Sequence, residues 1–344
     1  MPSTSRSRLS PVRTAGIVAV AGLLVVVLVT AATPWPSAML IRWVFGMGAE
    51  RNVDIMQQFA PAEEVRSELD IQPAVHDEAL AFDLFLPDDG SDDALPTVVW
   101  VHGGAWISGS KSDVAPYLQI LASEGYAAVG LAYEYGPEVT YSAAVHQLNA
   151  ALAELVERAD EFRIDPDRIV LAGDSAGAQL ASQLATLTVN DDYAKLLGIA
   201  PAIEAEHLVG VVLNCGVYDL RAMAELSGIT SWGFKTALWA YTGNRDWSST
   251  YAGATMSTVN FVTEDFPATF ITGGNGDGLT WLQSVPMHHA LQDKDVDVTA
   301  LFWPAEHEPA LPHEYQFELD RPEAQEALAQ TLDFLGRVTD IQGD

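Results

Sequence analysis

The sequence predicts an α/β fold in which a mostly parallel central sheet carries helices on both faces. Stretches with leucines at helical spacing, such as residues 143–158 and 323–337, alternate with short apolar runs. These runs are apolar throughout, which is typical of strands buried on both faces. Alternation of strands and helices favours a parallel sheet. The runs comprise residues 98–101, 127–131, 169–172, 209–213, 268–271 and 298–302.

The first strand of this sheet has a different pattern. In residues 79–87, Leu80, Phe82 and Leu84 alternate with a second set of residues that includes Asp83. A period of two residues indicates a strand with one solvent-exposed face. We therefore expect the sheet to begin with an antiparallel strand.

The regular spacing of strands is interrupted once, between Tyr218 and Phe266. Tryptophan, tyrosine and phenylalanine residues are frequent in this stretch, which contains no buried-strand pattern. We predict a small helical cap insertion, at about residues 220–262, over the carboxyl edge of the sheet. An ordinary pair of surface helices filled with core aromatics is the alternative.

The N-terminal segment has the pattern of a membrane anchor or a secretory signal. A basic segment, residues 1–14 with Arg6, Arg8 and Arg13, precedes an uncharged run at residues 15–32. Its length favours a single membrane-spanning helix, with the arginines in the cytoplasm and the rest of the chain outside it. Secretion after cleavage near Val29-Thr30-Ala31 is the alternative. Residues 33–60 are interpreted as a short interfacial helix and linker, and residues 61–344 as the main domain.

Composition excludes some partners. With a formal net charge of −30, the chain has little to neutralise a phosphate backbone, so nucleic acid is not an expected partner. The single cysteine, Cys215, permits no internal disulfide and lies in an apolar run, which indicates a packing role. No histidine pair has the spacing of a zinc site, and no cofactor is expected. The oligomeric state is left open.

The motif Gly173-Asp174-Ser175-Ala176-Gly177 lies directly after one apolar run and before a helical stretch. A strand, a sharp turn and a helix are what a nucleophile elbow requires. The two glycines leave room in so tight a turn, in which the serine backbone is strained. Ser175 is therefore the candidate nucleophile.

A second motif, His102-Gly103-Gly104-Ala105, follows the run at residues 98–101. Acyl transfer creates a negatively charged oxygen, and backbone N–H groups must already point at it. Consecutive glycines allow a close approach of the backbone. The position of this motif, at a strand end upstream of Ser175, favours an oxyanion-binding loop over an ordinary turn.

Together the two motifs resemble those of the hormone-sensitive-lipase-like branch of the α/β-hydrolases, over roughly residues 79–338. The resemblance implies an α/β-hydrolase fold and oxyanion donors at the N–H groups of Gly103, Gly104 and Ala176. It also implies that an acid and then a histidine follow the serine along the chain. Ala105 is a departure, because many members of this branch have a third glycine at that position.

Histidine must take the proton of Ser175, and a carboxylate must orient that histidine. Asp277 is the favoured acid because it follows the run at residues 268–271 in a glycine-rich turn, and Asp219 is the alternative. His307 and His313 both follow the last strand, so spacing does not choose between them. The resemblance favours His313, which precedes the last helices in the segment Pro312-His313-Glu314-Tyr315.

These observations predict a serine esterase that cleaves small-molecule carboxylic esters through an acyl-enzyme, with a Ser175–His313–Asp277 triad. Amide or formamide hydrolysis would use the same residues and is an alternative. A non-catalytic binding protein with the same fold is a second alternative. The sequence does not specify the acyl chain length or the physiological substrate.

Overall fold

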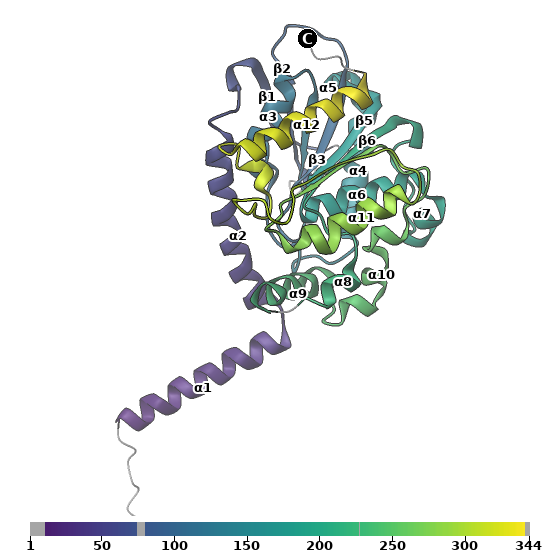
Figure 1. Ribbon diagram of the computed structural model, residues 1–344. Coiled ribbons are helices and arrows are strands. Elements are labelled where there is room, and N and C mark those ends of the chain that lie inside the picture. Colours follow the sequence, from purple (N-terminus) through teal and green to yellow (C-terminus); the bar gives the residue numbers. More distant parts are fainter. Residues whose placement is uncertain (1–10, 74–79, 227, 341–344) are drawn as a thin grey trace, which may run out of the picture.

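The computed structural model describes residues 11–73, 80–226 and 228–340 (Figure 1). Within them, eight strands form one sheet in the order β1-β2-β4-β3-β5-β6-β7-β8. The strands are β1 (Val65–Ile71), β2 (Phe82–Pro87), β3 (Leu95–Val101), β4 (Ala127–Leu131), β5 (Ile164–Asp174), β6 (Leu208–Asn214), β7 (Thr269–Gly273) and β8 (Val298–Phe302). Strand β2 pairs antiparallel with β1 and β4, and all the other neighbours in the sheet are parallel. The predicted mostly parallel sheet with an antiparallel start is confirmed.

Helices cover both faces of the sheet. The longer ones in the body are α3 (Ala115–Ser123), α4 (Ala143–Glu157), α6 (Ala176–Val189), α11 (Val285–Gln292) and α12 (Pro322–Thr339), with the short α5 (Ala159–Phe162) and α7 (Asp191–Leu197) beside them. In β3, Val99 and Val101 pack in the same core cluster as α4, α6 and α11, whereas Val98 and Trp100 pack with α3 and α12. Burial on both faces explains why the parallel strands are apolar at every position.

Two features of the sheet edge differ from the sequence prediction. Strand β2 has no solvent-exposed face, because the carboxylate of Asp83 is buried and accepts a hydrogen bond from Lys111 Nζ at 2.5 Å. The edge strand β1 was not predicted at all. Its residues 66–70 are exposed, so it lacks the continuous apolar run by which the other strands were found.

Three helices lie between β6 and β7, in the region where a cap was predicted. They are α8 (Leu220–Ala224), α9 (Gly228–Thr242) and α10 (Tyr251–Thr255), and Figure 1 shows them together at one end of the sheet. This is the end where β3 and β4 finish. Tyr241 of α9 stacks on Trp106 beyond β3 with ring centroids 5.8 Å apart, and its carbonyl accepts a hydrogen bond from the N–H of Tyr141 beyond β4 at 2.8 Å.

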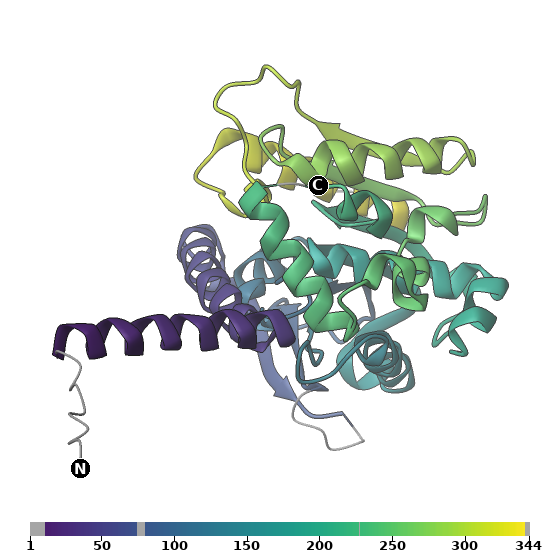
Figure 2. The ribbon, with the colours of Figure 1, turned by 90° about the horizontal axis from the view of Figure 1, so that it is seen from below.

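The N-terminal region forms two helices, α1 (Pro11–Ala32) and α2 (Trp35–Met56). Figures 1 and 2 both show α1 projecting away from the body, whereas α2 runs along it. None of the described helices alone is long and apolar enough to cross a membrane. Residues Ala19–Ala32 and Trp35–Met56 pass that test only as a pair, which is bent by 86°. Arg6 and Arg8, and with them most of the predicted basic segment, lie outside the described residues.

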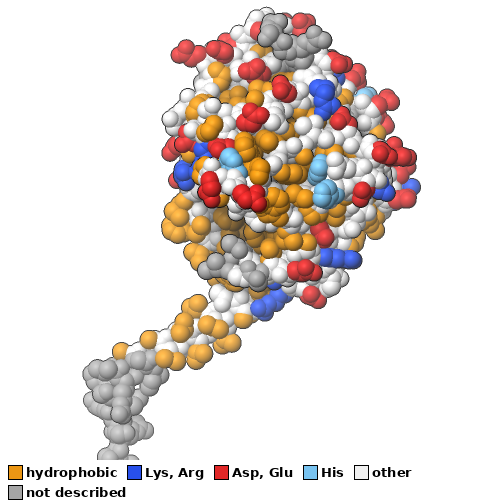
Figure 3. Space-filling view, in the orientation of Figure 1, with side chains coloured by type: hydrophobic (Ala, Val, Ile, Leu, Met, Phe, Trp, Pro, Cys, Tyr) orange, Lys and Arg blue, Asp and Glu red, His pale blue; other side chains and the backbone are white. Residues whose placement is uncertain are grey.

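Helix α2 is longer than the short helix that the sequence predicted, and one side of it is buried against the body. It is 22 residues long, and it packs against α3 and α9 through buried residues that include Ala38, Ile41 and Met56. Much of its remaining surface is apolar and exposed, as at Trp43 and Leu40. Figure 3 shows hydrophobic side chains along α1 and over the adjoining part of the body.

Candidate active site

Ser175 lies in the sharp turn between β5 and α6. Its backbone has φ 52° and ψ −117°, a strained conformation for a residue with a side chain. The flanking glycines are required: a Cβ added to Gly173 would lie 2.5 Å from the carbonyl carbon of Gly177, and one added to Gly177 would lie 1.9 Å from Val101 O. The chain therefore turns tightly enough to hold the Ser175 hydroxyl above the end of the sheet.

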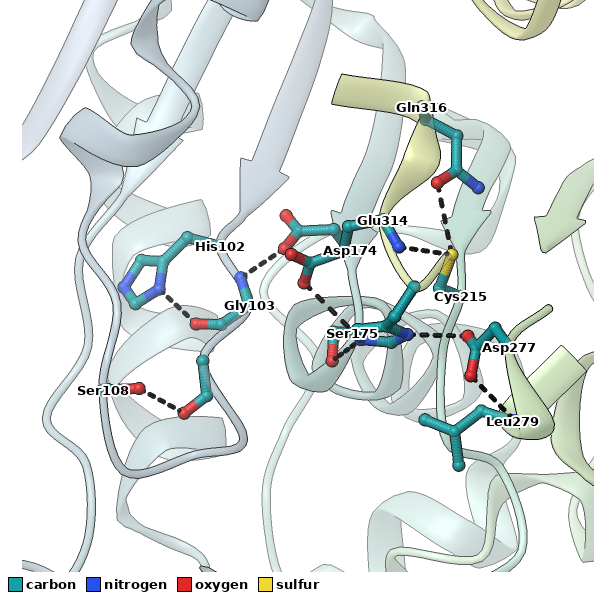
Figure 4. Close-up of polar contacts among 12 residues, drawn as sticks. His102, Gly103, Ser108, Asp174, Ser175, Cys215, Asp277, Leu279, Glu314 and Gln316 are labelled. Carbon is teal, nitrogen blue, oxygen red and sulfur yellow. Dashed lines mark hydrogen bonds and ion pairs between the residues drawn. The ribbon is translucent and has the colours of Figure 1, made fainter. Parts of the chain in front are cut away.

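Ser175, His313 and Asp277 form a continuous chain of hydrogen bonds (Figure 4). His313 Nε2 lies 2.9 Å from Ser175 Oγ, and His313 Nδ1 lies 2.7 Å from Asp277 Oδ2. The other oxygen of Asp277 accepts a hydrogen bond from the N–H of Leu279 at 2.9 Å. An ionised carboxylate only accepts hydrogen bonds, so Nδ1 carries the proton and Nε2 is free to accept that of Ser175.

The two alternative residues lie elsewhere. Asp219 caps α8, where its side chain accepts hydrogen bonds from the N–H groups of Arg221 and Ala222. His307 Nε2 forms a hydrogen bond with Glu323 Oε1 at 2.9 Å, and its ring packs on Trp303. The structure thus brings Asp277 and His313 together with Ser175, and gives Asp219 and His307 other partners.

The charges around His313 favour its protonated form. Burial by itself lowers the pKa of this imidazole, but the charge of Asp277 and its hydrogen bond raise it. Glu314 and Asp174 also contribute, and the pKa of His313 rises to about 9. Glu314 Oε1 is 3.7 Å from His313 Nε2, so this neighbouring carboxylate faces the nitrogen that must accept the proton of Ser175.

The loop after β3, residues 102–109, lies beside Ser175 and contains the second motif. Gly104, Ala105 and Trp106 all have positive φ, at 108°, 52° and 59°. A Cβ on Gly104 would lie 2.2 Å from Ser108 O, so only glycine fits this position. Within the described part of the chain, the N–H groups of Gly104 and Ala176 donate to no protein acceptor.

Gly103 does not match its predicted role as an oxyanion donor. Its N–H donates to Asp174 Oδ2 at 2.9 Å, and is therefore already engaged. The other oxygen of Asp174 accepts a hydrogen bond from Trp100 Nε1 at 2.8 Å. Burial, and then the charge of Glu314, raise the pKa of Asp174 well above its ordinary value. Asp174 thus holds the loop of residues 102–109 against the elbow, a role that the motif by itself did not indicate. This loop, which the sequence predicted to bind the oxyanion, is called the oxyanion loop below.

His102 stabilises the same loop from the other side. Burial lowers its pKa to about 4, so the ring is neutral, and its Nδ1–H donates to Gly103 O at 2.8 Å. The ring stacks on Tyr133 with centroids 4.5 Å apart. The hydrogen bond and the ring contact of His102 therefore stabilise the shape of the loop.

Cys215 is buried directly after β6, close to the triad. Its Sγ and one ligand atom each of Asp277 and His313 lie within 4.8 Å of one another. Burial, and then the charge of Asp277, raise the pKa of the thiol well above its ordinary value, so the thiolate needed for metal binding is disfavoured. A metal here would also compete for the atoms that join His313 to Asp277.

Comparison with known proteins identifies a family model and several solved structures that share the fold of this chain. The family model described as BD-FAE matches residues 82–291, well over half of the chain. Esterase B from Lactobacillus rhamnosis is 24% identical, with a TM-score of 0.73 over 89% of this chain and 96% of that one.

Two further solved structures agree. An esterase from Pyrobaculum calidifontis is 21% identical, with a TM-score of 0.67 over 87% of this chain and 92% of that one. A bacterial heroin esterase is 20% identical, with a TM-score of 0.68 over 87% and 90% of the two chains. At these identities the likeness establishes a shared fold.

Proposed function

The chain belongs to the BD-FAE family and has the α/β-hydrolase fold that its motifs predicted; on that premise we propose that it is a serine esterase. The observation that carries this proposal is the hydrogen-bonded chain from Ser175 through His313 to Asp277, with the serine on a strained elbow. The names of its structural relatives, which are esterases, support an ester as the substrate.

The proposed reaction begins when Ser175 Oγ attacks the ester carbonyl carbon and transfers its proton to His313 Nε2. The carbonyl oxygen becomes an oxyanion, which accepts hydrogen bonds from the N–H groups of Gly104 and Ala176. Asp277 stabilises the imidazolium that forms. The tetrahedral intermediate then expels the alcohol, which receives the proton from His313, and an acyl-Ser175 ester remains.

Water completes the cycle by the same route. His313 removes a proton from the water, whose oxygen attacks the acyl carbon, and the second intermediate releases the carboxylic acid as Ser175 regains its proton. Tyr241 of α9 and Trp106 of the loop after β3 are fully buried and stack on each other, so we propose that they fix the position of α9 beside this loop and do not contact the substrate. No cofactor takes part in the proposed steps.

The test is hydrolysis of p-nitrophenyl acetate, butyrate and octanoate by the full-length protein and its Ser175→Ala variant. We expect the variant to fold normally and to lose roughly 10⁴-fold or more in kcat, because the nucleophile is removed. Equal turnover by the two proteins would refute the assignment. If the folded wild type is inert on esters but cleaves aryl formamides, the amide-hydrolase alternative replaces it.

We also propose that α1 tethers the enzyme to a membrane, with the hydrolase domain outside the cytoplasm. Leucines and valines of α1, among them Leu23, Leu24 and Leu28, are exposed on the isolated chain and would otherwise face water. In cells expressing the full chain, the protein should stay with membranes through an alkaline carbonate wash. Release of a soluble form lacking residues 1–31 would instead identify a cleaved signal.

A further inference from the structure

Arg42 of helix α2 makes hydrogen bonds to the oxyanion loop, residues 102–109, and to the loop after β4. Its Nε donates to Ile107 O at 2.6 Å, and its Nη2 donates to Gly136 O at 3.0 Å. The same guanidinium pairs with both oxygens of Glu138, at 2.8 and 2.7 Å, and lies over the ring of Tyr135. Arg42 therefore binds the loop after β3 and the loop after β4 at the same time.

The segment that Arg42 contacts needs external support. Positive φ angles at three consecutive residues, 104–106, include two residues with side chains, and such strain persists only where neighbouring contacts impose it. Some support comes from the body, since Trp106 Nε1 donates to Gln179 Oε1 at 2.9 Å and Gly136 N donates to Trp106 O at 2.8 Å. Gly136 is thus bonded to the loop through its N–H and to Arg42 through its carbonyl.

Apolar contacts fix the backbone of α2 at the same place. Ala38 and Ile41, on the turn of helix that precedes Arg42, form a small buried cluster with Ala105 and Ile107 of the oxyanion loop. The cluster also contains Ala237 and Ala240 of α9. The backbone of Arg42 is therefore held in place by this cluster. Its planar guanidinium can then fix the orientation of the carbonyl groups of Ile107 and Gly136 that it binds.

From these contacts we propose that Arg42 is a positioning residue for the oxyanion site: it holds residues 104–107 so that the N–H of Gly104 faces the reacting carbonyl. The inference rests on the proposed esterase function. Arg42 itself does not touch the substrate, since its hydrogen bonds go to Ile107, Gly136 and Glu138. Its effect is transmitted through the loop backbone.

The experiment measures kcat and KM for p-nitrophenyl butyrate with the full-length wild type, Arg42→Ala and Arg42→Lys. Misplacing an oxyanion donor acts mainly on the transition state, so we expect kcat of the alanine variant to fall by roughly 10- to 100-fold. KM should change by less than about threefold. The lysine variant should recover little, because an ammonium lacks the fork that reaches both carbonyls. Millimolar guanidinium should restore part of the lost kcat to Arg42→Ala.

Arg51→Ala is the matched control, because Arg51 lies on the same helix, is mostly exposed and has only a 3.7 Å ion pair with Glu318. Its kcat should equal that of the wild type. A second readout is the affinity for a trifluoromethyl ketone, whose tetrahedral adduct occupies the oxyanion site. The affinity of Arg42→Ala for this compound should fall by the same factor as kcat/KM.

The inference would be overturned if Arg42→Ala had the kcat of the wild type. It would also be overturned if kcat fell equally in Arg42→Ala and Arg51→Ala and guanidinium did not restore it. If Arg42→Ala does not fold, Arg42→Lys decides: reduced kcat at an unchanged melting temperature supports the inference, and unchanged kcat refutes it. An inert wild type, with Ser175 unreactive toward a phosphonate ester, would instead refute the proposed esterase function.

Discussion

Replacing Asp277 by Asn tests the triad by changing one atom of its acid. In the structure Asp277 Oδ2 accepts from His313 Nδ1, and Oδ1 accepts from the buried N–H of Leu279 at 2.9 Å. An asparagine has only one oxygen for these two donors. Its carbonyl oxygen should stay with Leu279, because an N–H opposite another N–H would leave both unpaired. The amide NH₂ then faces His313.

The size of the effect follows from that orientation. A donor opposite Nδ1 selects the imidazole tautomer with a lone pair on Nδ1 and the hydrogen on Nε2. Nε2 then points its N–H at Ser175 and cannot accept the serine proton, and no carboxylate remains to stabilise an imidazolium. A change of this kind costs roughly 10³- to 10⁴-fold in kcat. At about 1.36 kcal/mol per factor of ten, this is about 4–5.5 kcal/mol of transition-state stabilisation.

The assay compares kcat for p-nitrophenyl butyrate in Asp277→Asn and Asp219→Asn, with circular dichroism to verify folding. Asp219 caps α8, and an asparagine oxygen can accept the same backbone hydrogen bonds, so this replacement should leave the melting temperature nearly unchanged and kcat within about twofold of the wild type. Retention of more than about a tenth of kcat by Asp277→Asn would refute the tautomer argument. A comparable loss in Asp219→Asn would assign the acid to that residue instead.

Two further substitutions test the charge and the backbone of the site. Because only neutral His313 accepts a proton, kcat/KM should rise with pH toward the pKa of about 9. Glu314→Gln removes a negative charge that raises this pKa, so the rise in kcat/KM should occur at lower pH. An unchanged pH profile, or the same shift in the exposed control Glu306→Gln, would contradict this. Gly104→Ala should reduce kcat by roughly 100-fold or more, because the new Cβ would collide with the loop backbone and displace an oxyanion donor. Gly90 is the control, because it also has a positive φ but an added Cβ would meet no neighbouring atom. Gly90→Ala should lower the stability of the protein and leave kcat unchanged. Equal losses of kcat in the two variants would show that Gly104 has no special part in catalysis.

The strands buried on both faces could be located from sequence because burial on two sides requires apolar residues at every position. The same reasoning failed at the sheet edge. Strand β1 is exposed at residues 66–70, most of which are polar, so no continuous apolar run marks it. Asp83 was interpreted as facing solvent because its polar side chain fits the alternating pattern of β2. Its partner, Lys111, is 28 residues further along the chain, so the pattern of neighbouring residues could not predict a buried pair.

The motifs indicated which residue types the site needs and where along the chain to look for them. They favoured Asp277 and His313 but did not exclude the alternatives, because Asp219 and Asp277 follow neighbouring parallel strands and His307 and His313 follow the same strand. Tertiary structure separates them by side-chain direction: Asp277 and His313 face each other, whereas Asp219 turns to α8 and His307 to Glu323. It also shows that the N–H of Gly103 is held by Asp174.

By itself the sequence determined the α/β architecture, the strained turn at Ser175 and the apolar character of residues 15–32, because each depends on local composition and spacing. Only the tertiary structure decided which parts of the protein α2 contacts. Its exposed aromatic residues suggested a segment at a membrane surface, yet Ala38 and Ile41 pack on the oxyanion loop and Arg42 bonds to Ile107 and Gly136. Arg42 is 65 positions from Ile107 and 94 positions from Gly136 in the sequence. These contacts depend on how the sheet brings its loops together, so a pattern among neighbouring residues cannot predict them.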